Sequence, residues 1–184
     1  MDKGNQSYQK FLDGDKQGLV EIIELYSDSL VSFINGFVHD YGTAEDLMQD
    51  TYLELIVKKH IFKGESQFKT YLFKIARNKA IDYIRKNKKL ISVNEGFVFY
   101  QNISQTVENT VVDSERNNII RSAMKKINPT YAQVLYLSFY ECMNNAEISS
   151  VIGKSKRQVE MLIYRAKDSL KKVLEKEGFN YEQI

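Results

Sequence analysis

The chain lacks the features on which most disulfide-stapled, metal-binding and membrane proteins depend. Its 184 residues include one cysteine, one proline and no tryptophan. The single thiol, Cys142, excludes a disulfide framework and a cysteine-based metal site, and it suits a reducing cytoplasm. No apolar stretch approaches the roughly 20 residues of a membrane span. The polar start MDKGNQSYQK does not resemble a signal peptide. We therefore expect a cytoplasmic protein without membrane insertion.

Helix-breaking residues are also scarce, which bounds the fold class. There are only nine glycines, and no long run alternates valine or isoleucine with polar residues. With 43% hydrophobic and 27% charged residues, the chain can bury a core. The length allows one ordinary domain or two small ones. The sequence predicts an all-α fold.

Charge is sorted along the chain, although the net charge is only +2. Residues 1–57 hold 3 Lys and Arg against 11 Asp and Glu, whereas residues 58–90 hold 11 against 2. Residues 91–115 hold none against 4, and residues 116–184 hold 12 against 7. This segregation predicts two basic surfaces for one polyanion and an acidic surface for a basic protein partner.

These patterns divide the chain into two small helical domains. We expect an N-terminal tail over 1–14, a first domain over 15–90 and a linker over 91–115, which has no basic residue and little periodicity. A second domain follows over 116–176, and then a C-terminal tail over 177–184. In the first domain, Asp15 is the expected N-cap of one helix, a second helix starts near Ser27, and a break falls at 41–43.

The segment AEDLMQDTYLELIVKK, which starts at Ala44, predicts a helix with an acidic start. Leu47, Thr51 and Leu55 form its buried side, continued one step round by Met48, Tyr52 and Ile56. Asp46, Gln49 and Asp50 lie in the first turns on the other side. Acidic residues there favour the helix dipole. A docking surface for a basic partner explains them equally well.

The segment SQFKTYLFKIARNKAIDYIRKNKK, which starts at Ser66, predicts a helix with two different sides and Ser66 as its cap. One side is apolar and carries Phe68, Leu72, Ile75, Ala76, Ala80 and Tyr83; the other carries Thr70, Tyr71, Lys74, Arg77, Asn78 and Arg85. A solvated basic face is one interpretation. Contact with DNA or RNA is favoured, because rings and amides stack on and hydrogen-bond to unpaired bases. In the preceding loop, the ring of Phe62 either packs on the core, as we expect, or stays free to bind something.

The last third of the sequence carries a helix-turn-helix pattern. Asn128-Pro129 opens a helix whose Val134, Leu135, Leu137 and Phe139 are expected to point inward. The pair Asn144 and Glu147 opens a short helix that Gly153 ends, and the pair Ser155 and Gln158 opens the next. One side of that last helix carries Val159, Ile163, Ala166 and Leu170. The other side carries Arg157, Gln158, Glu160, Met161, Tyr164 and Arg165.

Those exposed residue types can read bases, since arginine pairs with guanine, glutamine with adenine and glutamate with cytosine. The basic residues also contact phosphate, which gives affinity without sequence selectivity. The polar outside of an ordinary three-helix bundle would look similar.

Three segments, taken in order and spacing, resemble the extracytoplasmic-function (ECF) branch of the bacterial sigma-70-type factors. They are AEDLMQDTYLEL, FKGESQFKTYLFKIARNKAIDYIRK and INPTYAQVLYLSFYECMNNAEISSVIGKSKRQVEMLIYRAK. The likeness covers about residues 15–89 and 116–176. Tyr71 stands where most relatives carry tryptophan, and Cys142 replaces a common glycine.

The resemblance implies two helical domains, which correspond to sigma regions 2 and 4, and a role for each surface. Asp46, Gln49 and Asp50 would bind the beta-prime clamp helices of core RNA polymerase, with the beta flap and an anti-sigma factor as further partners. Recognition and melting of the −10 promoter element would fall to Phe62, Lys69, Thr70, Tyr71, Lys74, Arg77, Asn78 and Arg85, with Phe62 and Asn78 lining a pocket for a flipped-out base. Recognition of the −35 element would fall to Lys156, Arg157, Gln158, Glu160, Met161, Tyr164 and Arg165.

Two other functions are weighed against this interpretation. A stand-alone helix-turn-helix regulator explains residues 116–176 but gives the acidic and basic helices of the first domain no task. An enzyme is disfavoured because only His39 and His60 are present and no phosphate-binding glycine loop exists. No cofactor and no metal is implied. We expect two separately folded domains; a single globule that hides Arg77 and Arg157 would contradict this expectation.

Overall fold

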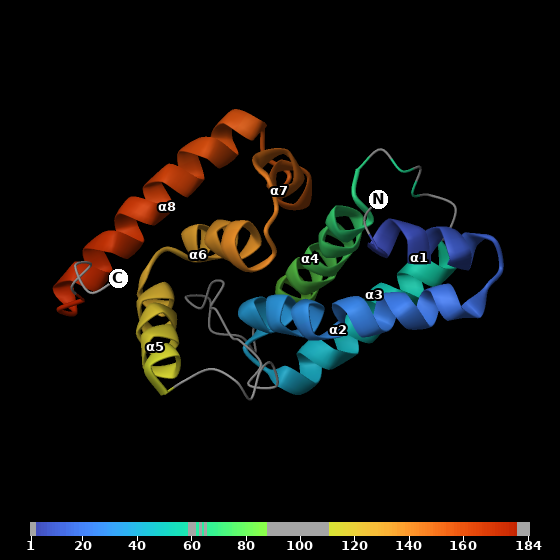
Figure 1. Cartoon of the computed structure of the whole chain (residues 1–184), viewed down its shortest axis with the longest axis horizontal. Coiled ribbons are helices and arrows are strands. Elements are labelled where there is room, and N and C mark those ends of the chain that lie inside the picture. The colour runs from blue at the N-terminus through green and yellow to red at the C-terminus, as the bar shows by residue number, and fades with distance from the viewer. Residues whose placement is uncertain (1–2, 59–61, 63, 65, 88–110, 180–184) are drawn as a thin grey trace.

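Every regular element of the described structure is a helix. The computed structural model describes residues 3–58, 62, 64, 66–87 and 111–179, and it contains no strand among them (Figure 1). The first domain comprises α1 (Lys3–Leu12), α2 (Lys16–Val38), α3 (Tyr41–Val57) and α4 (Phe68–Lys86). The second comprises α5 (Val111–Lys126), α6 (Pro129–Leu135), the π-helical turn η1 (Tyr136–Tyr140), α7 (Asn145–Ile152) and α8 (Lys156–Lys176). The all-α prediction is confirmed. Most of the predicted linker, and residues 180–184 of the predicted C-terminal tail, lie outside the described residues.

The segment predicted as an N-terminal tail forms helix α1 instead. Tyr8 on this helix is only 2% exposed, and its ring stacks on Phe68 with the centroids 4.6 Å apart. Phe11 packs against the same core. A few apolar residues among many polar ones give a weak periodic signal, yet burying two large rings outweighs it. Among its described residues, the first domain therefore has four helices.

The first domain also differs from its prediction at two helix ends. Asp15 caps α2 as expected, accepting a hydrogen bond from the Gln17 amide at 2.9 Å. The break expected near Ser27 is absent, since α2 runs unbroken from Lys16 to Val38, and the Ser27 hydroxyl donates to the Ile23 carbonyl one turn earlier. The next break falls earlier than predicted, at His39 with φ 58°, and Asp40 then caps α3.

The second domain follows its capping signals closely. Asn128 caps α6 with Pro129 in the first turn, and Asn144 with Glu147 forms a complete capping box on α7. Gly153 ends α7 with φ 70°, a left-handed conformation that glycine adopts without strain. Helices α7 and α8 thus form the predicted helix-turn-helix.

One side chain in this domain is exposed although the sequence predicts that it is buried. Phe139 was expected in the core but is 57% exposed. Residues 136–140 form a π-helical turn, in which the Glu141 amide bonds back to the Tyr136 carbonyl at 3.2 Å. A π-helical turn inserts one extra residue per turn, so the inward-facing register of α6 is lost after Leu137.

The two domains pack against each other and share one continuous cluster of buried apolar residues. Figure 1 shows α7 lying beside α4, and these two helices pack directly. The Tyr136 ring stacks on Phe33 of α2 at a centroid distance of 5.7 Å, and its hydroxyl donates to the Ser29 carbonyl at 3.3 Å. The domains are therefore not separate bodies in this structure. Arg157 remains exposed, whereas Arg77 is half-buried.

Candidate polymerase and nucleic-acid interfaces

Helix α3 presents its acidic residues on the face away from the core. Asp46, Gln49 and Asp50 are exposed, and the expected buried residues Leu47 and Leu55 are indeed buried. Ile56, expected on the buried side, is instead 39% exposed. The prediction that Ile56 is buried was therefore wrong. It assumed a buried stripe wider than the one that α3 has.

The same face of α3 continues into exposed apolar residues that the sequence analysis missed. Leu53 is 57% exposed and Val57 is 81% exposed. At 100° per residue they fall in line with Asp46 and Asp50. The spacing of seven residues from Asp46 to Leu53 was the signal that could have identified this stripe.

Helix α4 begins at a cap that comes from a distant part of the chain. The Phe68 amide donates to Asn5 Oδ1 of α1 at 2.8 Å. Ser66, the predicted cap, donates instead to the neighbouring carbonyl of Gln67. Gln67 occupies the cap position without a side-chain hydrogen bond of its own. The start of α4 is therefore fixed by α1.

Phe62 joins an aromatic cluster at this end of α4. Its ring stacks on Tyr71 at 5.0 Å and meets Tyr8 and Phe68 edge-on at 5.4 and 5.9 Å. The expectation that Phe62 packs on the core is thus confirmed. The ring stays half-buried, so one part of it remains accessible beside Tyr71. Burial raises the pKa of the Tyr71 phenol.

The eight residues assigned to −10 recognition divide into two groups in space. Lys74, Asn78 and Arg85 are exposed, and with Tyr71 they lie within about a quarter-turn of one another on the helix. Arg85 also pairs with Asp82 at 3.2 Å. This Tyr71–Arg85 face is the free side of α4.

Three other residues assigned to −10 recognition, Thr70, Arg77 and Lys69, lie off that face. Thr70 is 1% exposed, so the prediction that it lies on the exposed side of this helix is wrong; position 70 is about 100° from Tyr71 and turns inward. Arg77 is half-buried, and burial lowers the pKa of its guanidinium. Its buried Nε has no hydrogen-bond partner among the described residues.

Lys69 lies on the side of α4 that meets the second domain. Its Nζ is 2.7 Å from Oε2 of Glu141 and donates to the Glu141 backbone carbonyl at 2.9 Å. The ammonium group is also 5.7 Å from the centroid of the Phe73 ring. Lys69 therefore binds the other domain in this arrangement.

Helix α8 presents its whole predicted set to solvent. The core stripe is confirmed at Val159 and Ala166, which are fully buried. All seven residues assigned to −35 recognition are exposed. Tyr164, at 76% exposed, is more exposed than Met161, at 50%, on the same helix.

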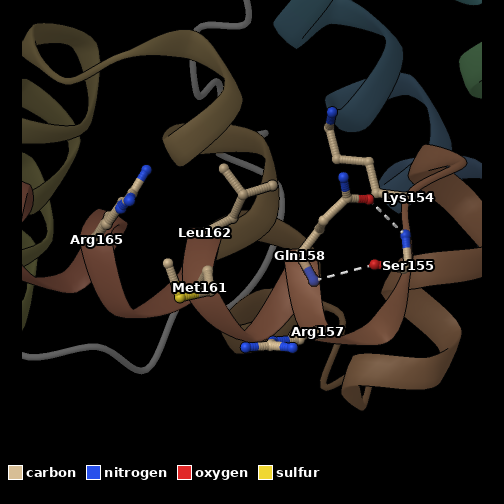
Figure 2. A pocket seen from close by; sticks show the side chains of 7 residues that line it. All are labelled: Lys154, Ser155, Arg157, Gln158, Met161, Leu162 and Arg165. Carbon is tan, nitrogen blue, oxygen red and sulfur yellow. Dashed lines mark hydrogen bonds between the residues drawn. The ribbon is translucent and has the colours of Figure 1, made fainter.

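The start of α8 borders a shallow hollow of about 440 Å³. Figure 2 shows the side chains that line it, which are Lys154, Ser155, Arg157, Gln158, Met161, Leu162 and Arg165. The Ser155 amide donates to Gln158 Oε1 at 2.9 Å, and the Gln158 amide donates to Ser155 Oγ at 3.3 Å. The capping prediction is confirmed, and the Gln158 carbonyl is engaged in it.

Two features are absent from the part of the chain that the structure describes. Among these residues, no group of three or more His, Cys, Asp or Glu side chains is placed to hold a metal ion. No helix within the same residues has the length and apolar character needed to cross a membrane.

Comparisons with known proteins match both domains. The family model described as Sigma-70 region 2 matches residues 22–90, and the model described as Sigma-70, region 4 matches residues 117–170. The chain is 29% identical to the ECF RNA polymerase sigma factor SigM of Bacillus subtilis, covering 88% of this chain and 98% of that protein. It is 26% identical to SigW of the same organism, covering 88% and 91%.

Solved structures share the fold. One is CnrH in complex with the cytosolic domain of CnrY, with a TM-score of 0.67, 19% identity and coverage of 95% of this chain and 98% of that one. Another is the sigma factor RpoE of Bartonella quintana in complex with the anti-sigma factor NepR, with a TM-score of 0.65, 19% identity and coverage of 83% and 94%. With both family models in order along one helical chain, this protein belongs to the sigma-70 family, in its ECF branch of RNA polymerase sigma factors.

Proposed function

We propose that this sigma factor uses three separate faces to place core RNA polymerase on a promoter. The exposed stripe of α3 binds polymerase, the Tyr71–Arg85 face of α4 recognises and melts the −10 element, and the outer face of α8 reads the −35 element. The order of the two family models along the chain, with two of these faces exposed in the region 2 match and one in the region 4 match, carries the proposal.

The α3 stripe supplies both charge and apolar contact for docking. Asp46, Gln49 and Asp50 give it a negative end suited to the basic residues of the beta-prime clamp helices. Leu53 and Val57 add the exposed apolar surface that protein interfaces bury at their centre. The second domain would dock on the beta flap. Two docking points hold the DNA-binding faces at a high effective concentration over one promoter.

Melting at the −10 element requires unpaired bases to be stabilised, since opening a base pair costs a few kcal/mol. Tyr71 and the accessible edge of Phe62 offer stacking surfaces, and Asn78 offers hydrogen bonds to a base edge. Lys74 and Arg85 lie along the same face and would follow the phosphates of the single strand.

The α8 face is equipped to read duplex DNA in the major groove. Arg157, Gln158 and Glu160 can pair with guanine, adenine and cytosine edges, and Met161 can contact apolar base edges. Lys156, Tyr164 and Arg165 would hold the phosphates that position the helix. Every one of these side chains is exposed, but Gln158 Oε1 accepts the capping bond from the Ser155 amide, and pairing with adenine through both amide atoms would compete with that bond.

A cytoplasmic location and an anti-sigma partner complete the proposal. CnrH and RpoE are each seen in complex with another protein, which for RpoE is the anti-sigma factor NepR. A similar inhibitor would bind this chain. The protein would act as a specificity factor rather than an enzyme, with no cofactor or metal of its own.

A gel-shift assay on duplex promoter DNA, with and without core polymerase, tests the proposal. The promoter would first be identified by run-off transcription, with the purified protein and core enzyme, on a library of genomic fragments. We expect tight, sequence-specific binding only when polymerase is present. Equally specific binding by the isolated protein would favour the alternative, a stand-alone helix-turn-helix regulator.

A further inference from the structure

The ring of Phe62 lies in an aromatic cluster, and part of that cluster comes from α1. The Phe62 ring stacks on Tyr71 with the centroids 5.0 Å apart and an interplanar angle of 28°. Tyr8 of α1 meets the same ring edge-on, at 5.4 Å and 76°. Tyr71 belongs to the free face of α4, whereas Tyr8 is only 2% exposed. Phe62 therefore joins the buried core to the free face.

Helix α1 is held on α2 at several points around Tyr8. The Glu21 carboxylate of α2 accepts hydrogen bonds from the Ser7 hydroxyl at 2.6 Å and from the Lys10 ammonium at 2.7 Å. These two donors lie one residue before and two residues after Tyr8. The Tyr8 ring also stacks on the fully buried ring of Phe68, with the centroids 4.6 Å apart. Tyr8 therefore has little freedom to reorient.

Helix α1 also reaches the second ring of the stack. Asn5 Oδ1 accepts a hydrogen bond from the Phe68 amide at 2.8 Å, which fixes the start of α4. Tyr71 follows Phe68 by three residues, in the first turn of the same helix. Burial, and then the nearby Tyr71 phenol, raise the pKa of Tyr8 to about 12. One short helix thus supports both of the rings that are accessible for stacking.

A stacking surface captures a base best when its rings are already in place. A ring that has to be ordered on binding loses part of its contribution to the affinity. If only a fraction of the molecules hold the ring correctly, the affinity falls by that same fraction. Phe62 lies outside the helices, so its orientation depends on the rings that it touches.

We propose that Tyr8 is a positioning residue for melting of the −10 element: its buried ring holds Phe62 against Tyr71, so that the two rings present a preformed stacking surface to an unpaired base. The proposal deepens the proposed function of α4 and rests on it. Tyr8 is covered, so it acts through Phe62 and does not contact the base itself. Edge-on aromatic pairs stabilise by more than the area that they bury, so loss of the Tyr8 ring should release Phe62.

The test measures how much a single base contributes to promoter affinity. Holoenzyme, formed from the full chain and core polymerase, is bound to a labelled promoter that is already unpaired over the −10 element. Each −10 base in turn is replaced by an abasic site, and fluorescence anisotropy gives the dissociation constant with and without the base. The ratio of the two constants reports base capture, because docking and the other DNA contacts are common to both measurements.

For the wild-type protein we expect this ratio to reach about tenfold or more at one −10 position, in keeping with the contribution of one stacked base. Tyr8→Leu should lower the ratio by about threefold or more, because Phe62 is then no longer held. Tyr8→Phe keeps the ring and should keep the ratio. A Tyr8→Leu ratio equal to that of the wild type would overturn the positioning role.

Phe73→Leu is the control for a general loss of stability. It removes another fully buried ring of α4, which packs on Phe33 at 5.1 Å. Position 73 is about 200° from Tyr71 around the helix, so the change lies away from the stack. This variant should be less stable than the wild type but should keep the ratio. An equal fall for Phe73→Leu and Tyr8→Leu would overturn the proposal, since stability alone would explain both.

A double variant tests whether Tyr8 acts through Phe62. Phe62→Leu removes the ring that Tyr8 positions, so adding Tyr8→Leu to it should lower the ratio no further. Independent losses from the two changes would contradict the proposal. Tyr8→Met, which fills more of the space without a ring, replaces Tyr8→Leu in every comparison if that variant does not fold.

Failure of the positioning role and failure of the proposed function give different results. A wild-type ratio of one at every −10 position would overturn base capture by α4, and the role of Tyr8 with it. A large wild-type ratio that Tyr8→Leu leaves unchanged would overturn the role of Tyr8 alone.

Discussion

Helices α4 and α8 carry most of the predicted DNA contacts, but the fold holds them in different ways. Helix α8 is fixed along a narrow stripe that includes Val159 and Ala166, and all seven of its assigned residues are exposed. Helix α4 packs against α1, α2, α3 and α7, so only one of its faces is free. Substitutions on α8 should therefore separate binding from stability, whereas substitutions on α4 should mix the two.

The largest expected effect is on stability, from a buried residue of α4. Phe68→Ala removes a fully buried ring that contacts Tyr8, Tyr26 and Phe62. We expect a loss of about 3–5 kcal/mol in the free energy of unfolding, because a cavity remains where the ring was. Chemical denaturation followed by circular dichroism measures it.

The matched change on α8 is Tyr164→Ala, at an aromatic residue that is 76% exposed. Its effect on the free energy of unfolding should stay within about 0.5 kcal/mol. Equal losses for the two variants would remove the contrast between the helices.

The next prediction asks whether both helices depend on the same docking surface. Asp50→Arg reverses a charge on the exposed α3 stripe, and we expect it to weaken binding to core polymerase by roughly 2 kcal/mol. Because docking precedes both promoter contacts, protection of the −10 and −35 elements should fall together. Asp13→Arg, an exposed change just after α1, is the control for added positive charge. Unchanged affinity of the Asp50 variant would show that α3 does not dock polymerase.

A third prediction separates base reading from phosphate contact. Arg157→Ala on α8 should cost about 1–3 kcal/mol of discrimination at the −35 element and relax the preference at one base pair. Lys74→Ala on α4 should weaken DNA binding evenly across sequences. It should also reduce the number of counterions released on binding, read from the salt dependence of the affinity, by about one. Binding to a panel of promoter variants by the polymerase holoenzyme at several salt concentrations measures both. Even weakening by Arg157→Ala would make that residue a phosphate contact only.

The smallest expected effect lies at the start of α4. Asn5→Ala removes the acceptor for the Phe68 amide, which should cost about 1 kcal/mol of stability, the usual value of a helix N-cap. Gln6→Ala changes the exposed neighbour of the same helix and should be close to neutral. Thermal unfolding of the two variants measures the difference. Matching melting temperatures would show that the cap from α1 contributes little.

Local signals in the sequence were sufficient wherever a helix depends on its own neighbours. The caps at Asp15, Asn128, Asn144 and Ser155 all form, since each bonds to an amide within three residues. Gly153 ends α7 for an equally local reason. These caps and the apolar stripe of α8 made the helix-turn-helix predictable.

Features that depend on distant partners could not be predicted from local pattern. The cap of α4 comes from Asn5, 63 residues away, and the partner of Lys69 is 72 residues away. Helical periodicity predicted correctly that Leu72 and Ala76 face inward, but it assigned Thr70 to the exposed side. A two-sided pattern has one buried side, whereas α4 is covered on more than one side by α1, α2, α3 and α7.

One departure from the relatives acquires a structural meaning. The resemblance to the family predicts a glycine at position 142, and Cys142 there adopts φ 52°, a left-handed conformation that favours glycine. The backbone shape implied by the family is thus retained with a different side chain.

The close crossing of α1 over α2 sets where a working fragment of this protein can start. A side chain at Gly18 would collide with the backbone of Ser7 and Phe11, so only glycine lets the two helices approach this far. The region 2 family model begins at residue 22, inside α2. A shortened protein cut to that match would lose Asn5, Tyr8 and the first turns of α2, and α4 would lose the helix that caps it; expression clones should therefore retain the residues before position 22.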